Sequence, residues 1–195
     1  METPIKLERD LDVLKSNLKE FANRGYTQIR IPGGTSKSED HYAGAFTMHY
    51  DKQTKQLYFL GVPYNPEYYK KQGHQDHEKK DCPPQFTAVR ETYEETGLIS
   101  EPEDLILVFK YDVIDRNDAT KKHTRYFYTL IKFSGSVSDF GYGPNLIDPE
   151  TSTPVWIPAE LFKMVLYKGH QEAFKKVIDS LKGKSVDFYY ALEKM

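Results

Sequence analysis

Residues 83–98 read PPQFTAVRETYEETGL, and this stretch decides the fold prediction. Two prolines stand at its start, where the first helical turn tolerates them because those backbone N–H groups have no partner within the helix. Gly97 stands near its end, where glycine readily adopts the left-handed conformation that closes many helices. The stretch therefore predicts a helix from Pro84 to Thr96.

Three carboxylates share one face of this predicted helix, because Glu91, Glu94 and Glu95 are spaced i, i+3 and i+4. The opposite face is predicted to pack on a sheet, and it carries Phe86, Val89, Tyr93 and Thr96. Like charges at this spacing repel one another, and the negative end of the helix dipole adds to the repulsion. A divalent cation would reverse the sign of this effect, and carboxylate oxygens suit Mg²⁺ or Mn²⁺. An ordinary solvated acidic face, with Arg90 paired to Glu94, is the alternative interpretation.

The segment from Arg90 to Leu98, RETYEETGL, resembles the second half of the Nudix box, R-E-U-x-E-E-x-G-U, in which U is a bulky aliphatic residue. Thr92 departs from the aliphatic position. The resemblance implies a Nudix-like α/β/α sandwich with a mixed β-sheet. It also implies Mg²⁺- or Mn²⁺-dependent cleavage of a pyrophosphate bond by activated water, in a nucleoside diphosphate linked to another moiety.

The resemblance implies roles for particular residues. Glu91, Glu94 and Glu95 would be metal ligands, and Arg90 would orient the carboxylates. The general base would be a box glutamate, Glu94, or a carboxylate of the loop 134–154. In that loop Glu150 is the first choice, and Asp139 is the next.

The first half of the box diverges from the family pattern. Cys82 stands where the family has glutamate, and Asp76 stands where it has glycine. This divergence motivates a second hypothesis: a catalytically weak or inactive Nudix-fold module that binds a nucleotide as a sensor or contacts a protein. Isomerisation of a prenyl diphosphate would need a placed cysteine and is disfavoured. So is a zinc site built from His74, His77 and Cys82, because one Cys and two His in a loop are weak evidence.

Aromatic residues make up 14% of the chain, with 15 Tyr, 11 Phe and 1 Trp. Part of this set is expected in the core, namely Phe86, Tyr93, Phe127, Phe133 and Trp156. Another part lies in two long loops, where rings could stack on a ring-bearing ligand. That second group is Tyr64, Tyr68, Tyr69, Phe140 and Tyr142.

The chain as a whole predicts interleaved helices and strands. Residues 1–26 are expected to form an N-terminal helical extension, because leucines at positions 7, 11, 14 and 18 with Phe21 make one stripe. Residues 27–185 are expected to form the Nudix-like domain, and residues 186–195 a tail that could be helical. Strands are expected at 27–31, 43–50, 56–62, 105–113, 123–133 and 155–157. The segment 32–34, Pro-Gly-Gly, is expected to interrupt the first of these strands.

Composition limits the classes of partner. The chain has 195 residues, with 27 Lys and Arg against 29 Asp and Glu, a net charge of −2. This balance argues against a protein that coats nucleic acid, and we expect a nucleic-acid partner only if a cap or terminal phosphate is the target. The single cysteine, the absence of a long apolar run and the N-terminal sequence predict a cytoplasmic protein without a membrane partner. The stripe of the first helix could dock on the domain or make a homodimer.

Overall fold

The computed structural model describes residues 7–36, 41–67, 83–115, 117–131, 151–185 and 188–189. Among these residues, no helix has the length and apolar character that crossing a membrane would require. The elements follow the interleaved order that the sequence predicts: α1 (Leu11–Asn23), β1 (Gln28–Arg30), β2 (Gly33–Thr35), β3 (His41–Asp51), β4 (Gln56–Tyr64), α3 (Pro84–Thr96), η1 (Pro102–Asp104), β5 (Leu105–Ile114), β6 (Lys122–Leu130), β7 (Val155–Pro158), α6 (Ala159–Val165) and α7 (Lys168–Leu181).

The strands form one mixed sheet. Its main path runs β1-β4-β3-β6-β5, while β2 pairs with β3 and β7 pairs with β4. The pairing of β3 with β6 is parallel, and the other pairings between named strands are antiparallel. Strand β3 is the hub, because it pairs with β6, β4 and β2 along its length.

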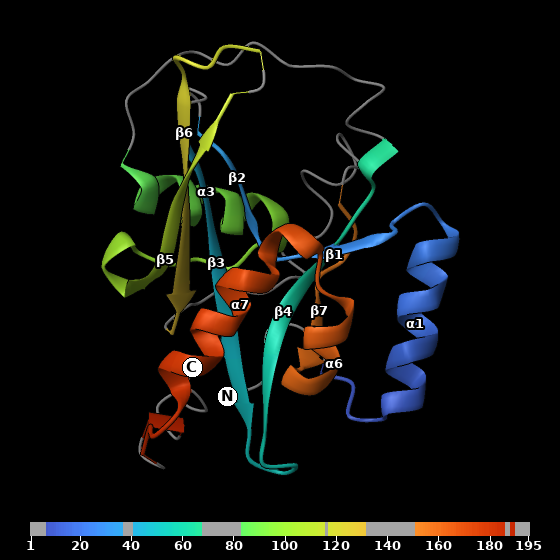
Figure 1. Ribbon diagram of the computed structural model, residues 1–195. Coiled ribbons are helices and arrows are strands. Elements are labelled where there is room, and N and C mark those ends of the chain that lie inside the picture. The colour runs from blue at the N-terminus through green and yellow to red at the C-terminus, as the bar shows by residue number, and fades with distance from the viewer. Residues whose placement is uncertain are drawn as a thin grey trace.

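Helices cover both faces of this sheet (Figure 1). Side chains alternate between the faces of a strand, and β3 follows this rule. Ala43 and Ala45 cluster with Ala88 of α3. Phe46 and Met48 belong to the main core, which also holds Phe162 of α6 and Phe174 of α7. The predicted α/β/α sandwich on a mixed sheet is therefore confirmed.

Strand β2 differs from the expectation for residues 32–34. The sequence predicted an interruption there, yet Gly33 and Gly34 pair with Gly44 and Ala43 of β3. Glycine within a strand marks a place where another group comes close to the backbone. A Cβ on Gly33 would lie 2.6 Å from Cα of Gly44, so β2 and β3 approach closely because neither position has a side chain.

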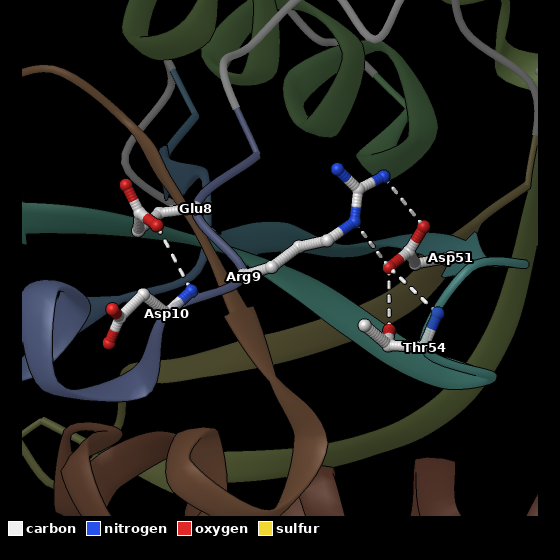
Figure 2. Close-up of polar contacts among 5 residues, drawn as sticks. All are labelled: Glu8, Arg9, Asp10, Asp51 and Thr54. Atoms are coloured by element: carbon white, nitrogen blue, oxygen red, sulfur yellow. Dashed lines mark hydrogen bonds and ion pairs between the residues drawn. The ribbon is translucent and has the colours of Figure 1, made fainter.

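Helix α1 begins later than predicted, at Leu11, because Asp10 caps it by accepting the backbone N–H groups of Asp12 and Val13. Leu14 of its stripe is buried in the main core. Just before the helix, Arg9 reaches Asp51 at the end of β3 (Figure 2). Its Nε and Nη2 donate to Oδ2 and Oδ1 of Asp51 at 2.8 and 2.9 Å. The Asp51 side chain is only 4% exposed, so this ion pair joins the N-terminal segment to the β3–β4 hairpin.

Asp51→Asn tests this junction. The Arg9 guanidinium beside Asp51 holds the pKa of that carboxyl well below its ordinary value of 3.8, with further help from Thr54 and against the cost of burial. We expect the substitution to lower the free energy of unfolding near neutral pH by about 1–3 kcal/mol, since hydrogen bonds to a buried charged group are weakened. Urea denaturation measures this change.

The direction of this pKa shift also predicts how the stability difference changes with pH. A carboxyl with a lowered folded-state pKa stabilises the fold fully above its unfolded pKa and loses that contribution as the pH falls. The difference between wild type and Asp51→Asn should therefore shrink below pH 3.8. Asp179→Asn, which removes the exposed partner of Lys182, is the matched control and should have little effect. Equal stability of wild type and Asp51→Asn near neutral pH would contradict the assignment.

Candidate functional site

Helix α3 spans Pro84–Thr96 as predicted, and Gly97 closes it in the left-handed conformation at φ 75°. The prediction of its buried face was correct for Thr96 and wrong for the two large rings. Phe86 and Tyr93 are 52% and 42% exposed. The fully buried side chains are smaller, namely Thr87, Ala88, Thr92 and Thr96. Small side chains let α3 lie close to β2 and β3, which the larger rings of the other face would prevent.

This orientation turns part of the acidic face toward the sheet. Glu91 and Glu95 are half-buried, whereas Glu94 is exposed. The Glu91 side chain retains 15% exposure and the Glu94 side chain 45%. The predicted set of three carboxylates therefore divides into two that face the sheet side and one that faces solvent.

Glu91 lies directly against β2. A Cβ on Gly34 would lie 2.4 Å from Cδ of Glu91, and 2.6 and 2.7 Å from its two carboxylate oxygens. No side chain other than that of glycine could occupy this position without displacing the carboxylate. The sequence reasoning missed Gly34, although two adjacent glycines after a proline were a signal of close approach.

Arg90 holds two of the glutamates. Its Nη1 lies 2.9 Å from Oε1 of Glu91 and 3.0 Å from Oε2 of Glu94. Its Nη2 donates to the carbonyl oxygen of Thr35 in β2 at 3.2 Å. Burial lowers the pKa of the Arg90 guanidinium, but the charges of Glu91 and Glu94 outweigh burial and raise it. Arg90 therefore stays charged and ties the acidic face to the strand beneath it.

The residues present suit a hard divalent cation in the chemistry of their donors and in the space that Gly34 leaves for Glu91. They do not converge in their present arrangement. Within the described ranges, no three His, Cys, Asp or Glu side chains are grouped closely enough to hold a metal ion. Nη1 of Arg90 lies between Glu91 and Glu94 and contacts one oxygen of each. Binding a cation there requires side-chain rotation, which exposed groups such as Glu94 undergo rapidly.

The second face of β2, opposite Glu91, lies against the side chain of Tyr42. A Cβ on Gly33 would lie 2.6 Å from the hydroxyl oxygen of Tyr42, which is within 3.2 Å of Nε2 of the buried His170. Burial raises the pKa of Tyr42, and the negative charges of Glu95 and Glu91 raise it further, while Arg30 and Arg125 oppose the rise. Tyr42 therefore lies within electrostatic reach of both the acidic face and two arginines. The sequence reasoning missed all four of Arg30, Tyr42, Arg125 and His170.

Several predicted site residues lie outside the described residues. They are the general-base candidates Glu150 and Asp139, the loop residues Cys82, His74 and His77, and the ring candidates Tyr68, Tyr69, Phe140 and Tyr142. Tyr64 is described, and its ring stacks on the guanidinium of Arg30, whose Cζ is 3.8 Å from the ring centroid. Of the expected core aromatics, Phe127 and Trp156 are fully buried.

No protein-family model matches the chain, and no curated protein matches its sequence. Solved structures are similar to it in fold. The NUDIX domain of Shewanella oneidensis NrtR complexed with ADP ribose shares 16% identity, over 73% of this chain and 88% of that chain, with a TM-score of 0.46. A C. elegans Ap4A hydrolase binary complex shares 15% identity, over 74% and 98%, with a TM-score of 0.44. The E. coli ORF135 protein shares 14% identity, over 79% and 100%, with a TM-score of 0.47. The first description names the family that residues 90–98 resemble.

Gly34→Ala tests the seat of Glu91. The added methyl group would collide with the carboxylate, so we expect a loss of about 1–3 kcal/mol in the free energy of unfolding. Glu91→Ala removes the colliding group, and the double variant Gly34→Ala/Glu91→Ala should recover much of that loss. Thermal and urea denaturation of the four proteins give the coupling energy. Strictly additive effects would mean that Gly34 and Glu91 do not interact.

Proposed function

We propose that this chain is a divalent-metal-dependent hydrolase that cleaves a pyrophosphate bond in a nucleoside diphosphate linked to another moiety. The observation that carries the proposal is the seat of Glu91 against Gly34, on a helix that turns Glu91 and Glu95 toward the sheet. The type of reaction is inferred from residues 90–98, because their order of Arg, Glu and Gly resembles the Nudix box.

The orientation of α3 is hard to explain by stability alone. Burial of a phenylalanine side chain typically stabilises a fold by about 1.5–3 kcal/mol. In the described structure Phe86 stays half exposed, while Glu91 occupies the sheet side. Three carboxylates on one helix face also repel one another, and Glu94 and Glu95 lie at the negative end of the helix dipole. An arrangement that forgoes apolar burial and gathers like charges favours a functional role for the charges.

Each residue has a proposed role. Glu91, Glu94 and Glu95 would hold Mg²⁺ or Mn²⁺, and Arg90 would orient the carboxylates while it remains charged. When bound, the metal neutralises phosphate charge and lowers the pKa of a bound water. Glu94 or Glu150 would accept the proton of the attacking water. Glu150 lies outside the described residues, so its part in the proposal rests on its place in the sequence.

Glu95→Gln tests the catalytic assignment. The substitution keeps the size and removes the charge of the side chain, so we expect kcat to fall by about 100-fold or more with the fold intact. The assay follows phosphate-bond hydrolysis with Mg²⁺ on a panel of nucleotide sugars, dinucleoside polyphosphates, capped RNA and dNTPs. Thermal denaturation checks the fold of the variant.

Glu160→Gln is the matched control, because Glu160 is an exposed glutamate in the first turn of α6. It should leave kcat unchanged. The proposal requires that the wild-type chain hydrolyse at least one substrate of the panel. Wild-type rates from Glu95→Gln would overturn the site assignment, and failure on the whole panel would overturn the proposed reaction.

The second candidate function is a nucleotide-binding or protein-contacting module with weak or no catalysis. Two observations favour it: the divergent first half of the box, and the ion pairs by which Arg90 already neutralises Glu91 and Glu94. In this case the acidic face is a structural network that needs no metal.

Titration with Mn²⁺ separates the two functions. The hydrolase proposal requires a saturable Mn²⁺ site on the wild-type chain, measured by electron paramagnetic resonance of free Mn²⁺. The affinity should fall by about tenfold or more in Glu91→Gln and in Glu95→Gln, since each loses a charged ligand. Glu160→Gln should titrate like the wild type. No saturable site on the wild-type chain would favour the binding module.

A further inference from the structure

The side chain of Arg30, in β1, is held by two aromatic rings and a glutamine. Its Cζ lies 3.8 Å from the ring centroid of Tyr64 and 4.3 Å from that of Tyr167, so the guanidinium is stacked on two rings. Nε and Nη2 both donate to Oε1 of Gln28, at 2.9 and 2.7 Å. These contacts fix the plane of the guanidinium and leave its remaining N–H groups for another acceptor.

Arg125 approaches the same region from β6. It is the register partner of Tyr42 in the parallel β3–β6 pair, and its Cζ lies 5.7 Å from the Tyr42 ring centroid. Within the part of the chain that the structure describes, neither Arg30 nor Arg125 forms an ion pair with a carboxylate. Both side chains are half-buried. Half-buried guanidinium groups normally find an anionic partner, since partial desolvation of a charge is costly.

A contiguous set of contacts joins the two arginines. Tyr167, which stacks on Arg30, has its ring centroid 5.3 Å from that of His170. The ring centroid of His170 in turn lies 5.8 Å from that of Tyr42, and the guanidinium of Arg125 lies over the Tyr42 ring. The arginines therefore flank one aromatic ridge, formed by Tyr167, His170 and Tyr42.

Among the described residues, the hydrogen bonds of this ridge leave the O–H of Tyr42 without an acceptor. The backbone N–H of Ile31 donates to Nδ1 of His170 at 3.4 Å, so the ring proton lies on Nε2. Nε2 then donates to the hydroxyl oxygen of Tyr42 at 3.2 Å, which leaves the Tyr42 O–H to donate elsewhere. Burial, Arg30 and Arg125 lower the pKa of His170 to about 3, so the imidazole is neutral and both positive charges of the region come from the arginines.

We propose that Arg30, Arg125 and the hydroxyl of Tyr42 form an oxyanion site that takes a phosphate group. Two charged guanidinium groups with planar donors and one neutral hydroxyl donor fit the charge and the acceptor geometry of a phosphate. The assignment of this phosphate to the substrate rests on the proposed function. The site would hold the end of the diphosphate substrate away from the acidic helix face, with Gly33 and Gly34 of β2 between them.

The test measures binding of pyrophosphate to the full chain by isothermal titration calorimetry in EDTA, so that no metal contributes. We expect Arg30→Gln and Arg125→Gln each to weaken the affinity by about tenfold or more, since each removes a charge-assisted contact. Tyr42→Phe should weaken it by about threefold to tenfold, because a neutral hydrogen bond is lost. These three residues lie on β1, β6 and β3, so a folding defect in one variant leaves two independent tests.

Arg24→Gln is the matched control, because Arg24 also lies over aromatic rings, those of Phe21 and Tyr26, but at the end of α1. It should bind pyrophosphate like the wild type. Failure of the wild-type chain to bind pyrophosphate, or wild-type affinity in both arginine variants, would overturn the site. Tighter binding of citrate than of pyrophosphate would overturn its assignment to phosphate.

The outcome is separable from that of the hydrolase assay. Glu95→Gln should lose hydrolysis but bind pyrophosphate in EDTA at least as tightly as the wild type, because it removes a negative charge that acts on Tyr42. If no substrate of the panel is hydrolysed but the arginine variants still lose pyrophosphate, the oxyanion site stands and the proposed reaction fails.

Discussion

The arrangement of charges around β2 depends on its two adjacent glycines, Gly33 and Gly34. A Cβ built on Gly33 and one built on Gly34 would point to opposite faces of the strand, because successive residues of a strand alternate. On one face a Cβ would strike the carboxylate of Glu91, and on the other it would strike the hydroxyl of Tyr42. Gly44 of β3 is subject to the same constraint, because a Cβ there would lie 2.8 Å from that hydroxyl. These two glycines thus leave room for the carboxylate of Glu91 on one face of β2 and for the hydroxyl of Tyr42 on the other.

Much of the fold could be predicted from local signals. The ends of α3 follow from Pro84 and Gly97, whose backbone preferences do not depend on the rest of the chain. The long strands follow from their apolar and aromatic residues. The buried face of α3 could not be predicted this way, because hydrophobic periodicity assumes that the largest apolar residues face the core. Here Thr92 and Ala88 face it, since closeness to β2 and β3 excludes larger side chains.

The sequence predicted the site residues that lie within one helix, but not those that other elements bring beside them. Glu91, Glu94, Glu95 and Arg90 lie within one helix, so their spacing alone places them together. Gly34, Tyr42, Arg125 and His170 come from four other elements, and their proximity depends on the strand order and on the parallel register of β3 with β6. No local pattern encodes that register. The electrostatic coupling of Tyr42 to Glu95 and Arg30 follows from this tertiary arrangement.

The ion pair between Arg9 and Asp51 also constrains the order in which parts of the chain fold. The two residues are 42 positions apart, and Thr54, in the turn that follows β3, completes the polar contacts of Asp51. During synthesis Arg9 is made 42 residues before its partner. The Arg9–Asp51 contact therefore forms only after β3 and the turn that follows it have been made, because contacts distant in sequence must wait for the intervening chain. The segment that carries Arg9 therefore completes this contact after the hairpin forms, although it precedes the hairpin along the chain.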